Sequence, residues 1–270
     1  MESSRKEFVW PVTWAVADPM LSAATEPILR AGGGHEIAVV GDFDDKATEA
    51  LLRELYPGWV SKAPYERLLQ EARDVPATRL FIDTPDKENS FYRARTNLSL
   101  RDDDPDYAAL VLANYMFGGG GGLGNRLLER VRQRDGISYG AGSGLNVRTH
   151  DRAASWTIGG IVAPQNSARF EQAVREEIDR MLKDGFTQKE LDDARNGLLQ
   201  ERLVTRADDG ALAGGWLSLL DAGRTFVFSK QLEDRMRALT PADVLNAVRR
   251  NIDPNKLTVV VAGDSKKGAK

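Results

Sequence analysis

A run of glycines at residues 118–122 is the most unusual local feature of the sequence. Together with Gly124 it formally matches the G-x-G-x-x-G pattern of dinucleotide-binding loops. That pattern requires a strand before the glycines, whereas a helical apolar stretch precedes them here, and the Lys-Ser/Thr of a phosphate loop is absent. Two interpretations stay open: a flexible helix–helix connection that allows positive φ, and a mobile loop that contacts the backbone of a ligand. The candidate ligand-binding residues are Gly118, Gly119, Gly120, Gly121 and Gly122.

Residues that bind catalytic metals are scarce. The chain has no cysteine and only two histidines, His35 and His150, both in polar or glycine-rich surroundings. Zinc catalysis uses three protein ligands, commonly including paired histidines on one helix face, and neither H-E-x-x-H nor H-x-x-E-H occurs. We therefore expect both histidines at the surface and no metal bound by this chain.

Motifs for nucleophilic catalysis are also missing. The segment 142–144 (Gly-Ser-Gly) is too short for a G-x-S-x-G elbow. The acidic groups at 102–104 and 192–193 are explained by a helix start and a solvated helix face. By residue type alone Arg132 and Tyr139 are structural, because the helix dipole favours an arginine near a C-terminus and tyrosine is common at a strand start.

Composition indicates an ordinary globular protein. Of 270 residues, 41% are hydrophobic and 29% charged, and the formal net charge is −3. Acidic and basic residues are well mixed, with no basic stripe, which argues against a nucleic-acid partner. The absence of cysteine excludes disulfides and thiol chemistry, and it fits the cytoplasm and a bacterial periplasm equally well. No apolar run is long enough to span a membrane.

The N-terminus has some features of a signal peptide. Arg5 and Lys6 precede the apolar stretch 8–17. Pro11 interrupts that stretch, however, and Asp18 ends it without a clear cleavage site, so we interpret it as ordinary structure.

A strand-like run that ends in Gly-Asp occurs twice, at 36–42 and at 257–264. Apolar runs before Gly-Asp are common, so coincidence is one explanation. The separation is a usual domain length, and the alternative is that two related domains each end in this way. Four proline or glycine breakers between the two domains indicate a linker. The predicted organisation is the remnant of a preceding domain at 1–60, a linker at 61–76, a complete domain at 77–265 and a tail at 266–270.

Apolar periodicity and turn residues predict alternating strands and helices. Thr187 and Glu190 form a capping box, in which each side chain bonds the backbone of the other. A short helix at 65–72 is expected inside the linker. The predicted strands are 36–41, 79–83, 90–99, 139–147, 153–162 and 257–262. The predicted longer helices are 46–56, 105–117, 123–134, 166–183, 187–204, 211–221, 232–239 and 240–251.

The order of several motifs resembles one family closely. The segments are Asn114-Tyr-Met-Phe-Gly-Gly-Gly, then Asn125-Arg-Leu, then Arg132-Gln-Arg-Asp-Gly-Ile-Ser-Tyr139. The later stretch Gly185-Phe-Thr-x-x-Glu-Leu-x-x-Ala-Arg and the last strand also fit. Together, over about residues 36–265, they resemble the pitrilysin, insulin-degrading and mitochondrial-processing peptidases, zinc enzymes with an H-x-x-E-H motif.

This resemblance implies an α+β fold, in which each domain is a largely antiparallel sheet with helices packed on it. It also implies that two halves close around an unfolded peptide. One half binds zinc, and the other supplies an arginine and a tyrosine to the same site. Arg132 and Tyr139 match that pair, and the glycine run resembles the substrate loop of the mitochondrial enzyme's non-catalytic subunit, although that loop is longer.

The sequence departs from the family by lacking the zinc motif and most of the first domain. We therefore expect a fragment of a longer chain: the non-catalytic half of a zinc metallopeptidase, inactive alone, with zinc in the complementary half. The alternative is a catalytically dead scaffold or peptide-binding module. Peptides and a zinc-bearing half are the expected partners, and pairing of the strand 36–41 with a second copy makes a homodimer a further expectation.

Overall fold

The computed structural model describes residues 6–10, 37–55, 67–120 and 124–268, with 6–10 described as backbone only. The chain divides into two compact units. The first unit comprises Met1–Leu69 and Glu201–Lys230, and the second comprises Gln70–Gln200 and Gln231–Lys270. The domain boundaries expected from the sequence stay predictions.

The second unit is built on a five-stranded sheet with the strand order β3-β7-β4-β6-β5. Only β3 and β7 run parallel; the other neighbouring strands are antiparallel. The predicted α+β class with a largely antiparallel sheet is therefore confirmed. The strand bounds are β3 Arg79–Asp83, β4 Ser90–Leu98, β5 Gly140–Asn146, β6 Ala154–Val162 and β7 Thr258–Gly263.

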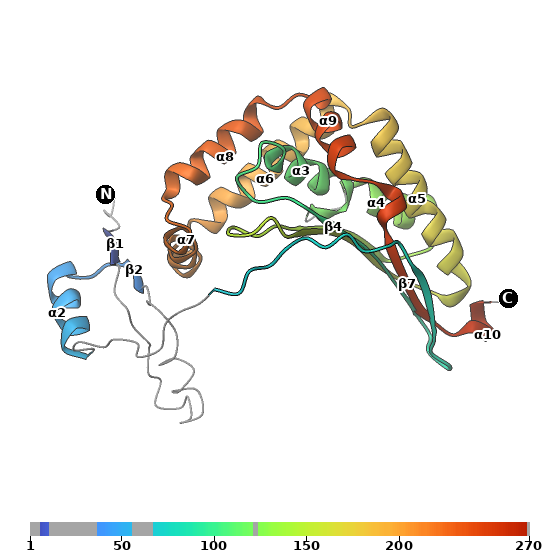
Figure 1. The fold of residues 1–270 in the computed structure, drawn as a ribbon, viewed down its shortest axis with the longest axis horizontal. Coiled ribbons are helices and arrows are strands. Elements are labelled where there is room, and N and C mark those ends of the chain that lie inside the picture. The colour runs from blue at the N-terminus through green and yellow to red at the C-terminus, as the bar shows by residue number, and fades with distance from the viewer. Residues whose placement is uncertain (1–5, 11–36, 56–66, 121–123, 269–270) are drawn as a thin grey trace. The chain divides into compact units, whose positions relative to one another are not determined.

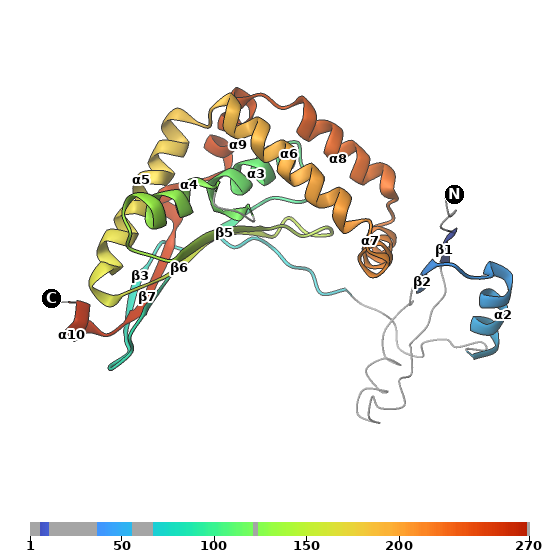
Figure 2. The same ribbon diagram turned by 180° about the vertical axis from the view of Figure 1, so that it is seen from behind.

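Helices cover one face of this sheet, as Figure 1 and, from behind, Figure 2 show for α3, α4, α5 and α9. The π-helical stretch η1 extends α3, and the π-helical stretch η2 extends α4. Each helix with its extension corresponds to most of one predicted helix, 105–117 or 123–134. The bounds in the first half of the unit are α3 Tyr107–Asn114, η1 Tyr115–Gly119, α4 Arg126–Leu128 and η2 Glu129–Arg134. The later bounds are α5 Ser167–Asp184, α6 Gln188–Thr205, α9 Pro241–Asn251 and α10 Ser265–Gly268, with short 3-10 turns η3 Pro164–Asn166 and η4 Pro254–Lys256.

The hydrophobic core lies between the sheet and these helices. Along β4 the side chains alternate, so that Tyr92 and Ala94 are buried while Phe91, Arg93 and Arg95 are exposed. These helices therefore leave the opposite face of the sheet uncovered. Other large core side chains are Leu112, Phe117, Leu127, Trp156, Ile158, Phe170, Ile178 and Met181.

The first unit contains a two-stranded antiparallel sheet, in which Phe8 of β1 lies opposite Val39 of β2. The predicted strand 36–41 is therefore paired within the chain. Asp44 caps the following helix as expected, because its carboxylate accepts from the backbone N–H of Ala47 at 2.9 Å. Helix α7 lies next to β2. The bounds are β1 Lys6–Trp10, β2 Ile37–Gly41, α2 Asp45–Leu55 and α7 Asp209–Asp221, and α8 Phe226–Ala238 crosses into the second unit.

Several local predictions were wrong. Residues 67–72 form no helix, and 65–66 lie outside the described residues. Helix α3 begins at Tyr107 rather than 105, because the carboxylate of Asp104 binds the backbone of Arg101 and the guanidinium of Arg152 instead of capping the helix. Helix α8 begins six residues earlier than the predicted 232, at Phe226. In the described part of the chain, no helix is both long and apolar enough to cross a membrane.

Gly160 of β6 gives a test of the packing between sheet and helices. A Cβ at this position would lie 2.3 Å from the ring of Phe170 on α5, which itself packs on Tyr92 with ring centroids 5.2 Å apart. We expect Gly160→Ala to lower the free energy of unfolding by roughly 1–3 kcal/mol through overpacking. Urea unfolding measures the loss. The matched control is Gly140→Ala, where a Cβ meets nothing within 4 Å; equal stabilities of the two variants would contradict this account.

Candidate functional site

The first two glycines of the run end the π-helical stretch η1, and Gly118 packs against the edge strand β5. A Cβ on Gly118 would lie 2.9 Å from the backbone nitrogen of Ser143, and one on Gly119 would lie 2.2 Å from Nδ2 of Asn114. None of the described glycines of the run has positive φ. Gly118 and Gly119 are thus required by close packing, and not by a left-handed turn.

Asn114 anchors this region. Its Oδ1 accepts hydrogen bonds from the Ser143 hydroxyl at 2.8 Å and from Nε1 of the buried Trp156 at 3.0 Å. The last helical turn before the glycines is therefore fixed to both β5 and β6. Gly118 is buried, whereas Gly119 is exposed and Gly120 is partly exposed. Gly121 and Gly122 lie outside the described residues.

The chain after the glycines is fixed by Asn125 and Arg126. Asn125 is the N-cap of α4, and its Oδ1 accepts from the N–H of Leu128 at 2.9 Å. The guanidinium of Arg126, only 6% exposed, donates to both carboxylate oxygens of Glu190 and to the carbonyl of Gly185 at 2.8 Å. It also lies over the ring of Phe186, 4.3 Å from the centroid.

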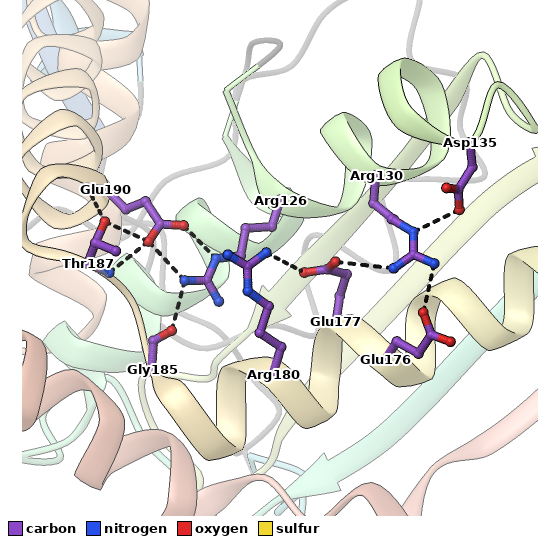
Figure 3. Close-up of polar contacts among 9 residues, drawn as sticks. All are labelled: Arg126, Arg130, Asp135, Glu176, Glu177, Arg180, Gly185, Thr187 and Glu190. Carbon is purple, nitrogen blue, oxygen red and sulfur yellow. Dashed lines mark hydrogen bonds and ion pairs between the residues drawn. The ribbon is translucent and has the colours of Figure 1, made fainter.

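Glu190 thereby serves two structures with one carboxylate. The predicted capping box is confirmed: Oε2 of Glu190 accepts from the N–H of Thr187 at 2.7 Å, and the Thr187 hydroxyl accepts from the N–H of Glu190 at 3.2 Å. The same carboxylate binds Arg126, as Figure 3 shows. Burial alone raises the pKa of Glu190, but the hydrogen bonds from Arg126 and Thr187 outweigh it and lower the pKa to about 2.

A second ionic cluster ties η2 to α5. Arg130 donates to Asp135 at 2.8 Å and to Glu176 at 2.7 Å, and it lies 3.7 Å from the buried Glu177. Glu177 is also 3.5 Å from Arg180 (Figure 3). The pKa of Glu176 is lowered, chiefly by its hydrogen bond with Arg130. This cluster fixes the orientation of the helix that carries Arg132.

The segment between Arg132 and Tyr139 is closed by backbone contacts. The carbonyl of Val131 accepts from the N–H groups of Ile137 and Ser138, and Gly136 makes the turn with φ of 61°. The Ser138 hydroxyl lies 2.8 Å from the carbonyl of Ile161 on β6. A sharp, well-bonded turn therefore brings the end of η2 to the start of β5.

The structure brings Arg132 and Tyr139 together. The guanidinium carbon of Arg132 lies 4.7 Å from the centroid of the Tyr139 ring, and Tyr139 is 84% exposed. Within the described residues, no carboxylate pairs with Arg132. The tyrosine hydroxyl can donate to a carbonyl oxygen, and the arginine can bind a peptide carbonyl or carboxylate beside it.

The described residues contain no group of three His, Asp or Glu side chains arranged to hold a metal ion. His150 is exposed in the turn between β5 and β6, and His35 lies outside the described residues.

The fold and these motifs have counterparts in known proteins. A family model described as the peptidase M16 inactive domain matches residues 35–198, more than half of the chain. The chain belongs to the peptidase M16 inactive-domain family. This confirms the resemblance to pitrilysin-like peptidases drawn from the motif order.

Individual relatives are distant. The non-peptidase homolog YmxG of Helicobacter pylori (strain ATCC 700392 / 26695) is 22% identical over 205 residues, which cover 75% of this chain and 46% of that protein. A crystal structure of a peptidase M16 inactive domain from Pseudomonas fluorescens superposes with a TM-score of 0.76 at 25% identity, over 92% of this chain and 59% of that one.

A protease from Helicobacter pylori shares the fold alone, with a TM-score of 0.71 at 13% identity over 84% of this chain and 55% of that one. The chain thus spans between 46% and 59% of the length of these relatives.

Asn114 and Arg126 were not identified from the sequence as residues that hold the site, nor was the contact of Glu190 with Arg126. The first two lie in the quoted motifs, so their positions were visible. Their partners were not, since Arg126 and Glu190 are 64 residues apart along the chain.

The ion pair gives a pH-dependent stability prediction. The folded-state pKa of Glu190 lies below its ordinary value of 4.5, so its contribution is complete above about pH 4.5 and is lost as the pH falls toward about 2. We expect Glu190→Gln to destabilise the protein by roughly 3–5 kcal/mol near neutral pH, because Arg126 is left buried without a counter-charge. Unfolding by urea is measured for both proteins across this pH range, and the difference between them should shrink toward acid pH.

Asp193→Asn serves as the control, since its carboxylate lies on the same helix and pairs with an exposed lysine, Lys189. A stability gap between wild type and Glu190→Gln that is independent of pH would contradict the assignment.

Proposed function

We propose that this M16 inactive domain is the non-catalytic half of a zinc metalloendopeptidase. In this proposal it forms one wall of a peptide-binding chamber, while zinc is held by a complementary half with the H-x-x-E-H motif. Tyr139 donates a hydrogen bond to the scissile carbonyl oxygen as negative charge develops there. Arg132 holds the peptide backbone beside it.

The observation that carries the proposal is the contact between Arg132 and Tyr139. Two residues named by the family resemblance are adjacent, and the tyrosine is almost fully exposed on a segment fixed by two ionic clusters. A ring that is 84% exposed contributes little to packing of the core. The exposed hydroxyl is instead available to a ligand.

The glycine run enters the proposal in a narrower form than the sequence suggested. Gly118 is buried against β5, so contact with a peptide falls to Gly119 and Gly120 among the described glycines.

The proposal is tested by mixing this chain with a pitrilysin-like half that carries H-x-x-E-H and following cleavage of a fluorogenic peptide. Activity is expected only in the mixture. Tyr139→Phe should lower kcat by roughly 100-fold with little change in KM, as for the loss of one oxyanion donor. Arg132→Ala should raise KM as well, because it removes a contact made before the transition state.

The control is Arg134→Ala, an exposed arginine of the same π-helix. Full activity of both site variants in an active mixture would overturn the assigned roles. Cleavage by the isolated chain would overturn the placing of zinc in the other half.

A second candidate is a scaffold or peptide-binding module without catalysis. It is favoured by the relative YmxG, which is described as a non-peptidase homolog. This candidate requires binding of a partner or peptide but no hydrolysis in any pairing. Sedimentation of the chain, alone and mixed, reports both the complex and the homodimer expected from the sequence.

A further inference from the structure

The sheet face away from the helices carries a groove lined by glycines. Its volume is about 470 Å³, and its floor runs over β4, β6 and β5. Gly140, Gly142 and Gly144 of β5 lie opposite Ile161, Gly159 and Thr157 of β6. Because glycine has no side chain, this part of the sheet is shallow and exposes its surface to a ligand.

Arg93 of β4 lies across this glycine floor. A Cβ on Gly159 would lie 3.4 Å from its Nη1, so the guanidinium is in van der Waals reach of this glycine. Two residues further along β4, Arg95 projects from the same face and lines a second hollow of about 630 Å³ together with Arg73 and Arg148. The open face thus presents a row of cations beside the groove.

Arg93 and Arg95 have no acidic partner among the described residues. Several other arginines of the unit are paired with carboxylates: Arg126 with Glu190, Arg130 with Asp135 and Arg250 with Asp106. Next to the groove, the carboxylate of Asp74 is taken by Lys256 at 3.1 Å. Arg93 is the charged residue that lines the glycine groove, and the second hollow is lined by Arg73, Arg95 and Arg148 with one carboxylate, that of Glu71. Cations therefore outnumber carboxylates on this face, in a chain whose net charge is −3.

The spacing of the two arginines fits an extended peptide. Residues two apart in a strand are roughly 7 Å apart on one face, and an extended ligand repeats its side chains at the same interval. The groove begins at Gly140, the residue directly after Tyr139. Arg93 is level with Gly142 and Arg95 with Gly144, which places them about three and five residues along the strand from Tyr139.

We propose that the glycine-lined groove and the adjoining second hollow bind the acidic side chains of an extended peptide, with Arg93 taking one carboxylate and Arg95 the other. The peptide carries Asp or Glu at two positions separated by one residue. This substrate class rests on the proposed function, which places a peptide beside Tyr139.

The experiment measures binding of fluorescein-labelled peptides to the intact chain by fluorescence anisotropy. Three peptides of equal length are compared: one with glutamates at i and i+2, one with glutamates at i and i+1, and one with glutamines at i and i+2. The first should bind tightest, because only its carboxylates lie on the same side of an extended chain. Its affinity should fall as salt is added.

Arg93→Gln combined with Arg95→Gln should weaken binding of the first peptide by roughly tenfold and remove its advantage over the glutamine peptide. Arg169→Gln is the matched control, with the same change of charge at an exposed arginine of α5, on the helical side of the sheet. It should leave the affinity unchanged.

Equal affinity for all three peptides, no binding of any of them, or an equal loss in the Arg169 variant would each overturn the groove proposal. A single-stranded oligonucleotide that binds as tightly as the first peptide would also overturn it, since the site would then recognise any polyanion. The assay needs neither zinc nor a second half. Failure here therefore leaves the cleavage test of Arg132 and Tyr139 standing, and failure there leaves peptide binding standing.

Discussion

The buried ion pair between Arg126 and Glu190 joins three segments on which the rest of the site depends. Arg126 lies at the start of α4, four residues after the glycine run ends, and its guanidinium also binds the carbonyl of Gly185 at the end of α5. Glu190 closes the first turn of α6. The carboxylate of Glu190 and the carbonyl of Gly185 accept hydrogen bonds from Nε and Nη2 of this buried guanidinium, while its Nη1 has no hydrogen-bond partner among the described residues. The pair therefore fixes the position of α4 relative to α5 and α6. Because η2 continues from α4, the position of Arg132 depends on the same pair.

Steric contacts of glycine set the other limit on this architecture. Gly118 lets η1 lie close to β5, and Gly119 fits against the side chain of Asn114. Gly160 makes room for the ring of Phe170. At these positions the missing side chain serves packing and not backbone freedom. Glycines on the open face have a different consequence, because Gly140, Gly142 and Gly159 leave a trough beside the Arg132–Tyr139 pair.

Arginines on the two sides of the sheet differ in their carboxylate partners. On the helical side, several guanidinium groups that link helices are paired with carboxylates, as in the cluster of Arg130 with Asp135 and Glu176. On the open side Arg93 and Arg95 lack such partners among the described residues. The first arrangement holds helices together, and the second is suited to an external ligand. This contrast is why the open face, and not the helical layer, is the reasonable place to look for peptide recognition.

The sequence by itself determined what depends on neighbouring residues. The strand at 90–99, the helix at 46–56 and the Thr187–Glu190 capping box are local, and each followed from residues within a few positions of one another. The order of motifs was also sufficient for the family and the α+β class. Local signals failed at 67–72 and at Asp104, where contacts with distant residues, such as Arg152, replaced the expected helix or cap.

Only the tertiary structure decided which residues meet. The contact of Arg126 with Glu190, the anchoring of Asn114 by Trp156 and the row formed by Arg93, Gly142 and Gly159 all join segments far apart in the chain. Such contacts depend on strand order and register, and residue spacing does not encode these directly. The site's residue types were therefore predictable, but its geometry and the charge of its surroundings were not.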